Sequence, residues 1–244
     1  YGKNTHQIVE PLVTIVASPN GGNPDEIPNE DSRSFELDDL NIFAANRFTG
    51  LDRWDGGSRV AYGIRYGIYG QETQGRITIA QSYQLDKNDV FGEASGLTGN
   101  WSDYVLALNV TFSPYFDYIH KLRLDKDNFT VRRNELVTTF GPKSFKLSVG
   151  YLDINRNLDD PNEDSNDLED RREVRTSAQY DINENWSTYS SYTRNLKDGG
   201  KSIYADAGVL YQNECVQFKV TFRKRFIRDR DIEPSTSINF GFVL

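Results

Sequence analysis

The stretch VQFKVTFR, residues 216–223, alternates apolar and polar side chains without interruption. The same period of two returns in FKLSVGY at 145–151 and in VAYGIRYGI at 60–68. Because successive side chains of a β-strand point to opposite faces, each segment has one apolar and one polar face. A soluble β-sandwich buries the apolar face in a core, whereas a membrane β-barrel turns it toward lipid. The pattern predicts an all-β protein and leaves the environment of the apolar faces open.

The composition suits a membrane barrel. Of the 244 residues, 37% are hydrophobic, below the usual globular share, yet 13% are aromatic. A barrel wall has this balance because only alternate residues meet lipid, while aromatic girdles mark both interfaces. The net charge of −8 argues against a nucleic-acid partner. No apolar run approaches the roughly 18 residues of a membrane-spanning helix.

The alternation predicts about twelve strands, long enough to cross a bilayer at a tilt. Alternation is weakest in the sixth and ninth segments, and residues 35–40 are expected to form one helical turn in a loop. The strands are expected near 6–17, 58–70, 75–86, 102–113, 116–125, 128–140, 144–155, 171–183, 185–197, 201–212, 215–227 and 235–244.

The connections between these segments alternate in length. The even-numbered ones are short, as at 71–75 and 213–215, and the odd-numbered ones are mostly long, as at 18–57 and 156–170. Outer-membrane barrels have short periplasmic turns and longer outside loops, and a sandwich has no reason to sort its loops in this way. The sequence therefore predicts an antiparallel transmembrane β-barrel wall with its C-terminus on the periplasmic side.

The chain has no Met and no signal segment, so we expect it to begin inside a longer protein. Its single cysteine, Cys215, falls in a predicted periplasmic turn, in an oxidising compartment. One cysteine cannot form an internal disulfide. It therefore either bonds to a partner elsewhere or stays a free thiol.

No group of residues predicts catalysis. The only histidines, His6 and His120, fall in predicted strands, and no nucleophile, base and orienting group come together. Metal-ligand spacings and phosphate-binding loops are also missing from the pattern, so the chain is not expected to be an enzyme or to carry a metal or cofactor.

The stretch 46–54 is instead predicted to be a loop that folds back and plugs or caps the barrel, held by pairs of Arg and Asp side chains. Its candidate residues are Asn46, Arg47, Gly50, Asp52 and Arg53.

The polar faces carry basic residues predicted to line a lumen. These are Arg65, Lys146, Lys219 and Arg223. They fit either a hydrated lumen of mixed charge or a passage that handles anionic headgroups.

The last segment places apolar residues on one face. They include Ile238, Phe240 and Phe242. Pro234 stands at its start, where the missing amide donor is expected to weaken pairing between strands.

Three motifs occur in order: QIVEPL at 7–12, NRFTGLDR at 46–53 and YQNEC at 211–215. Together they resemble the LPS-assembly outer-membrane protein (LptD, or organic solvent tolerance protein) family. The resemblance implies translocation of lipopolysaccharide to the outer leaflet of a Gram-negative outer membrane, through a barrel with a lateral gate between its first and last strands. It implies that Cys215 bonds to a periplasmic domain. It also implies a lipoprotein plug (LptE-like) and a periplasmic bridge protein (LptA-like) as partners, besides the lipid of the outer membrane.

The family barrel is larger than twelve strands. We therefore expect residues 1–244 to be the C-terminal portion of an outer-membrane β-barrel domain, without the first strands and the N-terminal periplasmic domain. The alternative is a porin-like, twelve-stranded diffusion channel for small polar solutes. A soluble, carbohydrate-binding β-sandwich is a third possibility.

Overall fold

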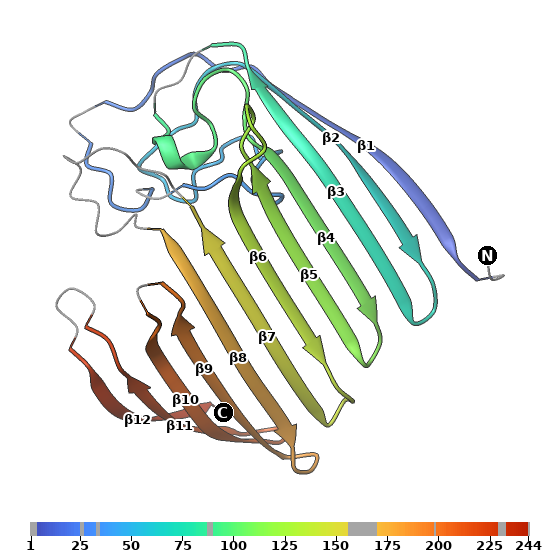
Figure 1. Cartoon of the computed structure of the whole chain (residues 1–244), viewed down its shortest axis with the longest axis vertical. Helices are drawn as coiled ribbons and strands as arrows, with labels where there is room; N and C mark the ends of the chain where they lie inside the picture. The colour runs from blue at the N-terminus through green and yellow to red at the C-terminus, as the bar shows by residue number, and fades with distance from the viewer. Residues whose placement is uncertain are drawn as a thin grey trace. The chain divides into compact units, whose positions relative to one another are not determined.

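The computed structural model describes residues 4–24, 27–32, 35–86, 90–155, 170–197, 199–228 and 233–243. Within them, twelve strands form one antiparallel sheet whose spatial order follows the sequence from β1 to β12 (Figure 1). The strands are β1 His6–Val16, β2 Arg59–Tyr69, β3 Thr73–Gln84, β4 Tyr104–Phe112, β5 Phe116–Leu124, β6 Val131–Phe140, β7 Phe145–Ile154, β8 Arg171–Asp181, β9 Trp186–Asn195, β10 Lys201–Gln212, β11 Gln217–Arg225 and β12 Ser235–Val243.

The predicted all-β fold class is confirmed. All twelve strands fall within three residues of their expected bounds, including the weakly alternating sixth and ninth. The helical turn expected at 35–40 is displaced. The Ile42 amide donates to the Asp38 carbonyl at 3.2 Å, so the turn begins at Asp38. The reason is local: the Asp38 carboxylate accepts hydrogen bonds from the Leu40 and Asn41 amides, which caps a turn at that residue. A 3₁₀ turn, η1 Glu93–Ser95, lies in the connection between β3 and β4.

No helix of the described residues has both the length and the apolar character needed to cross a bilayer.

The chain divides into two compact units. The first comprises 1–110, 119–134 and 154–170, and the second comprises 111–118, 135–153 and 171–244.

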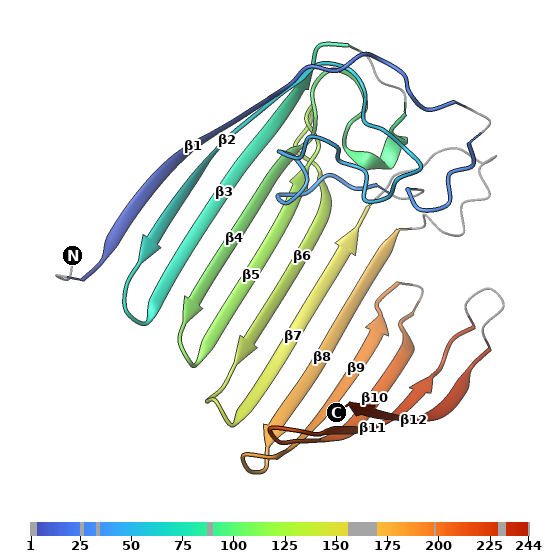
Figure 2. The same ribbon diagram turned by 180° about the vertical axis from the view of Figure 1, so that it is seen from behind.

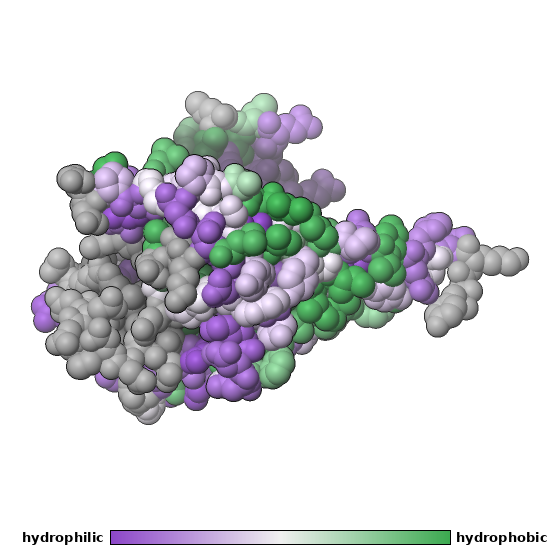
Figure 3. Space-filling view, turned by 90° about the horizontal axis from the view of Figure 1, so that it is seen from above, coloured by the Kyte–Doolittle hydropathy of each residue, from purple (hydrophilic) through white to green (hydrophobic). Residues whose placement is uncertain are grey.

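In the first unit, the register of β1, β2 and β3 separates two faces. Val13 pairs with Tyr62 and Ile64 pairs with Ile79, which places these apolar residues on one face. Glu10 pairs with Arg65 and Arg65 with Thr78 on the other face. The apolar face is uncovered: Val13 is 65% exposed, Ile64 49% and Ile79 40%. The view from above in Figure 3 shows hydrophobic residues in patches between hydrophilic ones.

The core of this unit lies against the opposite face, which carries small and polar side chains. Ala61 of β2, Ala80 of β3 and Val105 of β4 are its contribution from the sheet. The loops after β1 and β3 supply the rest: Leu37, Ile42, Phe48, Phe91 and Leu97. In both ribbon views these two loops lie side by side at one end of the strands (Figures 1 and 2), and the Leu37 amide donates to the Ser95 carbonyl at 3.0 Å. The loops therefore cover the polar face and leave the apolar one free.

The second unit repeats the separation. Val220 of β11 pairs with Val209 of β10 and with Phe240 of β12, which makes one apolar face. Arg223 pairs with Asp206 of β10 and Ser237 of β12, which makes the polar one. Phe240 is 72% exposed. Alternation in the sequence thus becomes, in each unit, an uncovered apolar face and a face of polar groups.

Candidate functional site

The loop after β1 is anchored by a buried cluster of charges. Arg47 donates two hydrogen bonds to the Asp55 carboxylate, from Nε to Oδ2 at 2.6 Å and from Nη2 to Oδ1 at 3.0 Å. Arg59, at the start of β2, reaches the same carboxylate with its Nη2, 3.1 Å from Oδ2. Exposure of these side chains is 0% for Arg47 and Asp55 and 1% for Arg59. Buried charges of this kind are tolerated when they are paired and hydrogen-bonded.

Further donors of the cluster also find partners, although Arg47 Nη1 is buried without a hydrogen bond to any described residue. Arg59 donates to the carbonyls of Ala44 and Ala45 at 3.0 and 2.6 Å. Arg47 donates to Gln84 Oε1 of β3 at 3.2 Å, and its guanidinium lies 4.9 Å from the centre of the Phe91 ring. The cluster thereby joins the loop after β1 to β2, β3 and the loop after β3.

The other candidate residues of this loop lie around two aspartates. Asp52 accepts hydrogen bonds from the backbone amides of Glu30 and Asp31. Asp31 accepts in return from the Leu51 amide at 2.8 Å and the Asp52 amide at 3.2 Å. These bonds, the one from Leu51 first, hold the pKa of the Asp31 carboxyl below its ordinary value. A Cβ at Gly50 would stand 2.0 Å from the Asp31 carboxyl, so a larger residue there would displace this carboxyl.

Asn46 accepts from the Asp55 amide at 3.3 Å, and Arg53 donates to the Ile27 carbonyl at 2.9 Å. Of the expected residues, Arg47 and Asn46 both contact Asp55. Asp52 and Arg53 instead form hydrogen bonds with backbone groups in another part of the loop. Asp55, which completes the cluster with Arg59, was missed by sequence reasoning. The sequence signal that could have identified Asp55 is its position immediately before the Gly56–Gly57 turn.

Further ion pairs link the loops to the sheet. Glu36 Oε2 lies 2.9 Å from Arg133 Nη1 of β6, and Asp39 Oδ1 lies 2.8 Å from Lys121 Nζ of β5. Arg123 of β5 donates to the carbonyls of Ala94 and Ser95 at 2.8 and 3.1 Å, beside η1.

Asp103, just before β4, lies 3.4 Å from the Arg123 guanidinium. Burial raises the pKa of the Asp103 carboxyl, and the nearby guanidinium offsets this only in part.

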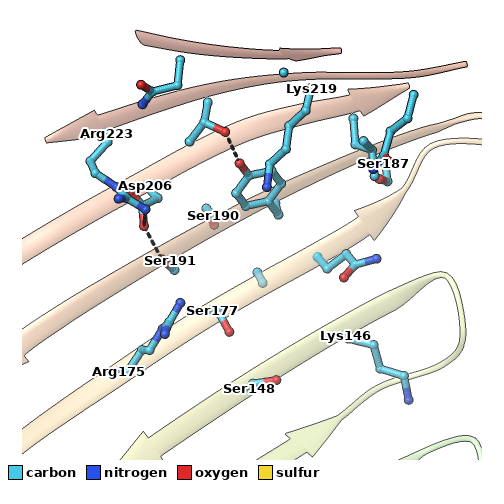
Figure 4. A pocket seen from close by; sticks show the side chains of 18 of the residues that line it. Lys146, Ser148, Arg175, Ser177, Ser187, Ser190, Ser191, Asp206, Lys219 and Arg223 are labelled. Carbon is cyan, nitrogen blue, oxygen red and sulfur yellow. Dashed lines mark hydrogen bonds and ion pairs between the residues drawn. The ribbon is translucent and has the colours of Figure 1, made fainter. Parts of the chain in front are cut away.

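In the second unit, the polar face lines a hollow of about 870 Å³. Its lining is rich in hydroxyl groups and carries four basic side chains and one acidic one: Lys146, Arg175, Lys219 and Arg223 against Asp206. Figure 4 shows Arg223 and Asp206 side by side and Ser191 pointing to Asp206. Arg223 Nε donates to Asp206 Oδ1 at 2.6 Å, and Ser191 Oγ donates to Oδ2 at 3.2 Å.

The other predicted lumen residues have varied partners. Lys146 donates to the carbonyls of Pro114 and Gly141. Lys219 Nζ lies 4.9 Å from the centre of the Tyr189 ring. Arg65, in the first unit, lies 3.4 Å from Glu10 Oε2. Arg175, which also lines the hollow, lies 5.9 Å from the centre of the Tyr204 ring.

The hydroxyl groups and basic side chains of this hollow are suited to a hydrated, anionic ligand such as a charged saccharide. Among the described residues, no group of three or more His, Cys, Asp or Glu side chains could hold a metal ion.

The last strand and the cysteine turn lie at the end of the sheet. Among the described strands, β12 pairs with β11 alone, and Ile238, Phe240 and Phe242 are all at least 60% exposed. Pro234 immediately precedes β12. Cys215 is an exposed free thiol in the turn between β10 and β11, where its amide donates to Asn213 Oδ1 at 3.0 Å.

The sequence of this chain is similar to those of known proteins. The LPS-assembly protein LptD of Idiomarina loihiensis is 23% identical over 202 residues, which are 80% of this chain and 25% of that protein. The LPS-assembly protein LptD of Aeromonas salmonicida is 21% identical over an alignment of 249 positions, which covers 99% of this chain and 30% of that protein. The chain thus spans less than a third of the length of either relative. A family model described as LptD, LPS transport system D, matches residues 1–186. This match covers well over half of the chain, and the chain therefore belongs to the LptD family.

Proposed function

We propose that this chain forms the C-terminal portion of an outer-membrane β-barrel that assembles lipopolysaccharide into the outer leaflet of a Gram-negative outer membrane. The observation that carries the proposal is the sorting of the two faces. Apolar residues such as Val13 and Ile64 are uncovered, while the loops pack on the polar face. A soluble sandwich would press its apolar faces together, whereas a barrel wall presents them to hydrocarbon.

The polar face supplies a path for the sugar part of the lipid. Hydroxyl groups and four basic side chains replace the water around a charged saccharide in the hollow lined by Lys219 and Arg223. The acyl chains need a separate path, because each methylene left in water costs about 0.8 kcal/mol. This requirement supports a lateral gate. In this proposal β12 is one lip of the gate, and Pro234, which has no amide donor, weakens pairing at its start.

The same proposal gives Cys215 a partner. An exposed thiol in a periplasmic turn lies in an oxidising compartment and is accessible to a second domain. We assign it a disulfide to the periplasmic domain of the full-length protein. A lipoprotein plug (LptE-like) and a periplasmic bridge protein (LptA-like) complete the assembly.

The test uses the full-length protein with its partners in a Gram-negative cell. A photo-cross-linking amino acid in place of Gln217, which lines the hollow, is expected to capture lipopolysaccharide. The matched position is Phe218, the next residue along β11, which lies on the apolar face opposite Phe242. Capture at Gln217 that depends on ongoing transport, with none of this dependence at Phe218, supports the proposal.

Two results oppose it. If the purified protein conducts small ions rapidly and Gln217 captures no lipopolysaccharide, the chain is part of a diffusion channel. If the protein folds without detergent and its gel migration does not change on heating, it is not a membrane barrel.

A further inference from the structure

Two carboxylates of the loop after β1 lie against basic residues of the sheet. Glu36 is 2.9 Å from Arg133 and Asp39 is 2.8 Å from Lys121. The four side chains are between 13% and 23% exposed. Water therefore reaches both pairs, in contrast to the fully buried Asp55. An ion that reaches this surface competes for the same cations.

The backbone that carries these carboxylates is fixed. Leu37 and Ile42 are completely buried in the core of the first unit. The Leu37 amide donates to the Ser95 carbonyl, and the Asp38 carboxylate caps its own turn. Glu36 and Asp39 are thus flexible side chains on an anchored segment. They can rotate away from Arg133 and Lys121 while the backbone of the loop keeps its place.

From this arrangement we propose that Lys121 and Arg133 form an anion-binding site, which Glu36 and Asp39 occupy until the phosphate groups of an anionic saccharide displace them. The inference rests on the proposed function, since that function brings a phosphorylated saccharide across this face. A guanidinium binds phosphate through two parallel hydrogen bonds and an ammonium binds it as a point charge, so this pair of cations suits a phosphate group. The exchange is non-covalent: the carboxylates return to water as the phosphate enters.

The proposed site makes the loop selective. A neutral sugar gains nothing by meeting paired charges, whereas a phosphate replaces one favourable contact with a stronger one. The carboxylates of Glu36 and Asp39 occupy the site when no phosphate is bound. Their removal is expected to open the site to weaker or more dilute anions.

The experiment places a photo-cross-linking amino acid at Ile119, two residues before Lys121 on the same face of β5, in the full-length protein with its partners. The double variant Glu36→Gln with Asp39→Asn keeps the size of both side chains and removes their charge. Cross-linking of purified lipopolysaccharide at Ile119 is expected to rise about fivefold, the scale of losing ion pairs that water partly reaches as competitors. Adding Lys121→Gln and Arg133→Gln is expected to abolish the rise, and so is the use of lipopolysaccharide stripped of its phosphates.

The matched control removes two charges elsewhere, with Glu30→Gln and Glu72→Gln, and is expected to leave cross-linking unchanged. Asp39→Asn alone serves as a milder variant, and heat-dependent gel migration verifies that each protein folds. A rise that also appears in the control, or that survives loss of Lys121 and Arg133, overturns the inference. So does an unchanged yield at Ile119 while Gln217 still captures lipopolysaccharide, and this leaves the proposed function standing. Failure of capture at both positions rejects the proposed function itself.

Discussion

At the scale of residues, the cluster of Arg47, Asp55 and Arg59 sets the position of the loop. Taking three charges out of water is costly, and their mutual attraction offsets this cost only with good geometry. Here two guanidinium groups share one carboxylate, and the carbonyls of Ala44 and Ala45 accept from Arg59. Such a cluster adds little to stability compared with an apolar core, but it requires one arrangement of the loop. Removing its single anion should therefore be far worse than removing an exposed one.

We accordingly predict that Asp55→Asn destabilises the protein by about 3–5 kcal/mol, because it leaves two buried guanidinium groups without an anion. Thermal unfolding of the full-length protein in detergent, followed by heat-dependent gel migration, measures the change. Asp52→Asn is the control, since Asp52 is only partly buried and accepts hydrogen bonds from the amides of Glu30 and Asp31, so its loss should cost far less. Equal losses in the two variants would contradict the assigned role of Asp55.

A second prediction at this scale concerns pH. Partial burial tends to raise the pKa of Asp125, in the connection after β5. Hydrogen bonds from Arg132 and from the amides of Asp127 and Asn128 outweigh this effect, and the pKa lies below its ordinary value. A lowered folded-state pKa means that the carboxylate stabilises the protein fully above the ordinary value of about 3.9. This stabilisation is lost as the pH falls through the folded-state pKa.

The difference in unfolding free energy between the native protein and Asp125→Asn should thus shrink on acidification from pH 6 toward the folded-state pKa. Asp103 contributes in the opposite direction, because its raised pKa makes stability fall as pH rises through its titration. Asp125 is one cause of that raised pKa, so the comparison is made in an Asp103→Asn background. A difference independent of pH would show that Asp125 does not stabilise the connection through its charge.

At the scale of elements, the strands could be read from the sequence and the loop contacts could not. Each strand carries its own signal, because alternate side chains meet different surroundings. That signal survives even in β6, where Arg132 and Arg133 are adjacent and point to opposite faces. Arg47 and Asp55 are brought together by a turn of the loop, and Glu36 meets Arg133 across 97 residues. No local pattern encodes such distances, so the sequence suggested the nearer Asp52 as a partner.

The two faces of a strand give a matched pair of substitutions. Val220→Lys places a charge on the apolar face of β11, and Asn239→Lys places one on the polar face of β12. At the middle of a bilayer the first is expected to cost about 2–4 kcal/mol, and the second little, because the polar face is hydrated. Unfolding in lipid vesicles by denaturant measures both. Similar costs would mean that the two faces meet similar surroundings, which would count against a barrel wall.

At the scale of the whole molecule, the strand order ends at β1 and β12, each with one neighbour among the described strands. An edge strand exposes unpaired amides and carbonyls, which hydrocarbon cannot satisfy. The chain also spans 25–30% of the length of its curated relatives. We therefore propose that the strands pairing with these edges, and the domain that meets Cys215, belong to the rest of a longer protein.

If the domain that meets Cys215 lies in the rest of the full-length protein, Cys215 should form a disulfide there. Oxidised native protein should migrate differently on gels before and after reduction, because a disulfide between distant domains constrains the unfolded chain. Cys215→Ser should abolish this difference and leave the migration of the reduced form unchanged. Mass spectrometry of the non-reduced protein should identify a peptide that joins the turn after β10 to the periplasmic domain. A modifiable Cys215 thiol in the native, non-reduced protein would exclude the bond, while leaving the barrel wall to be judged by the faces of its strands.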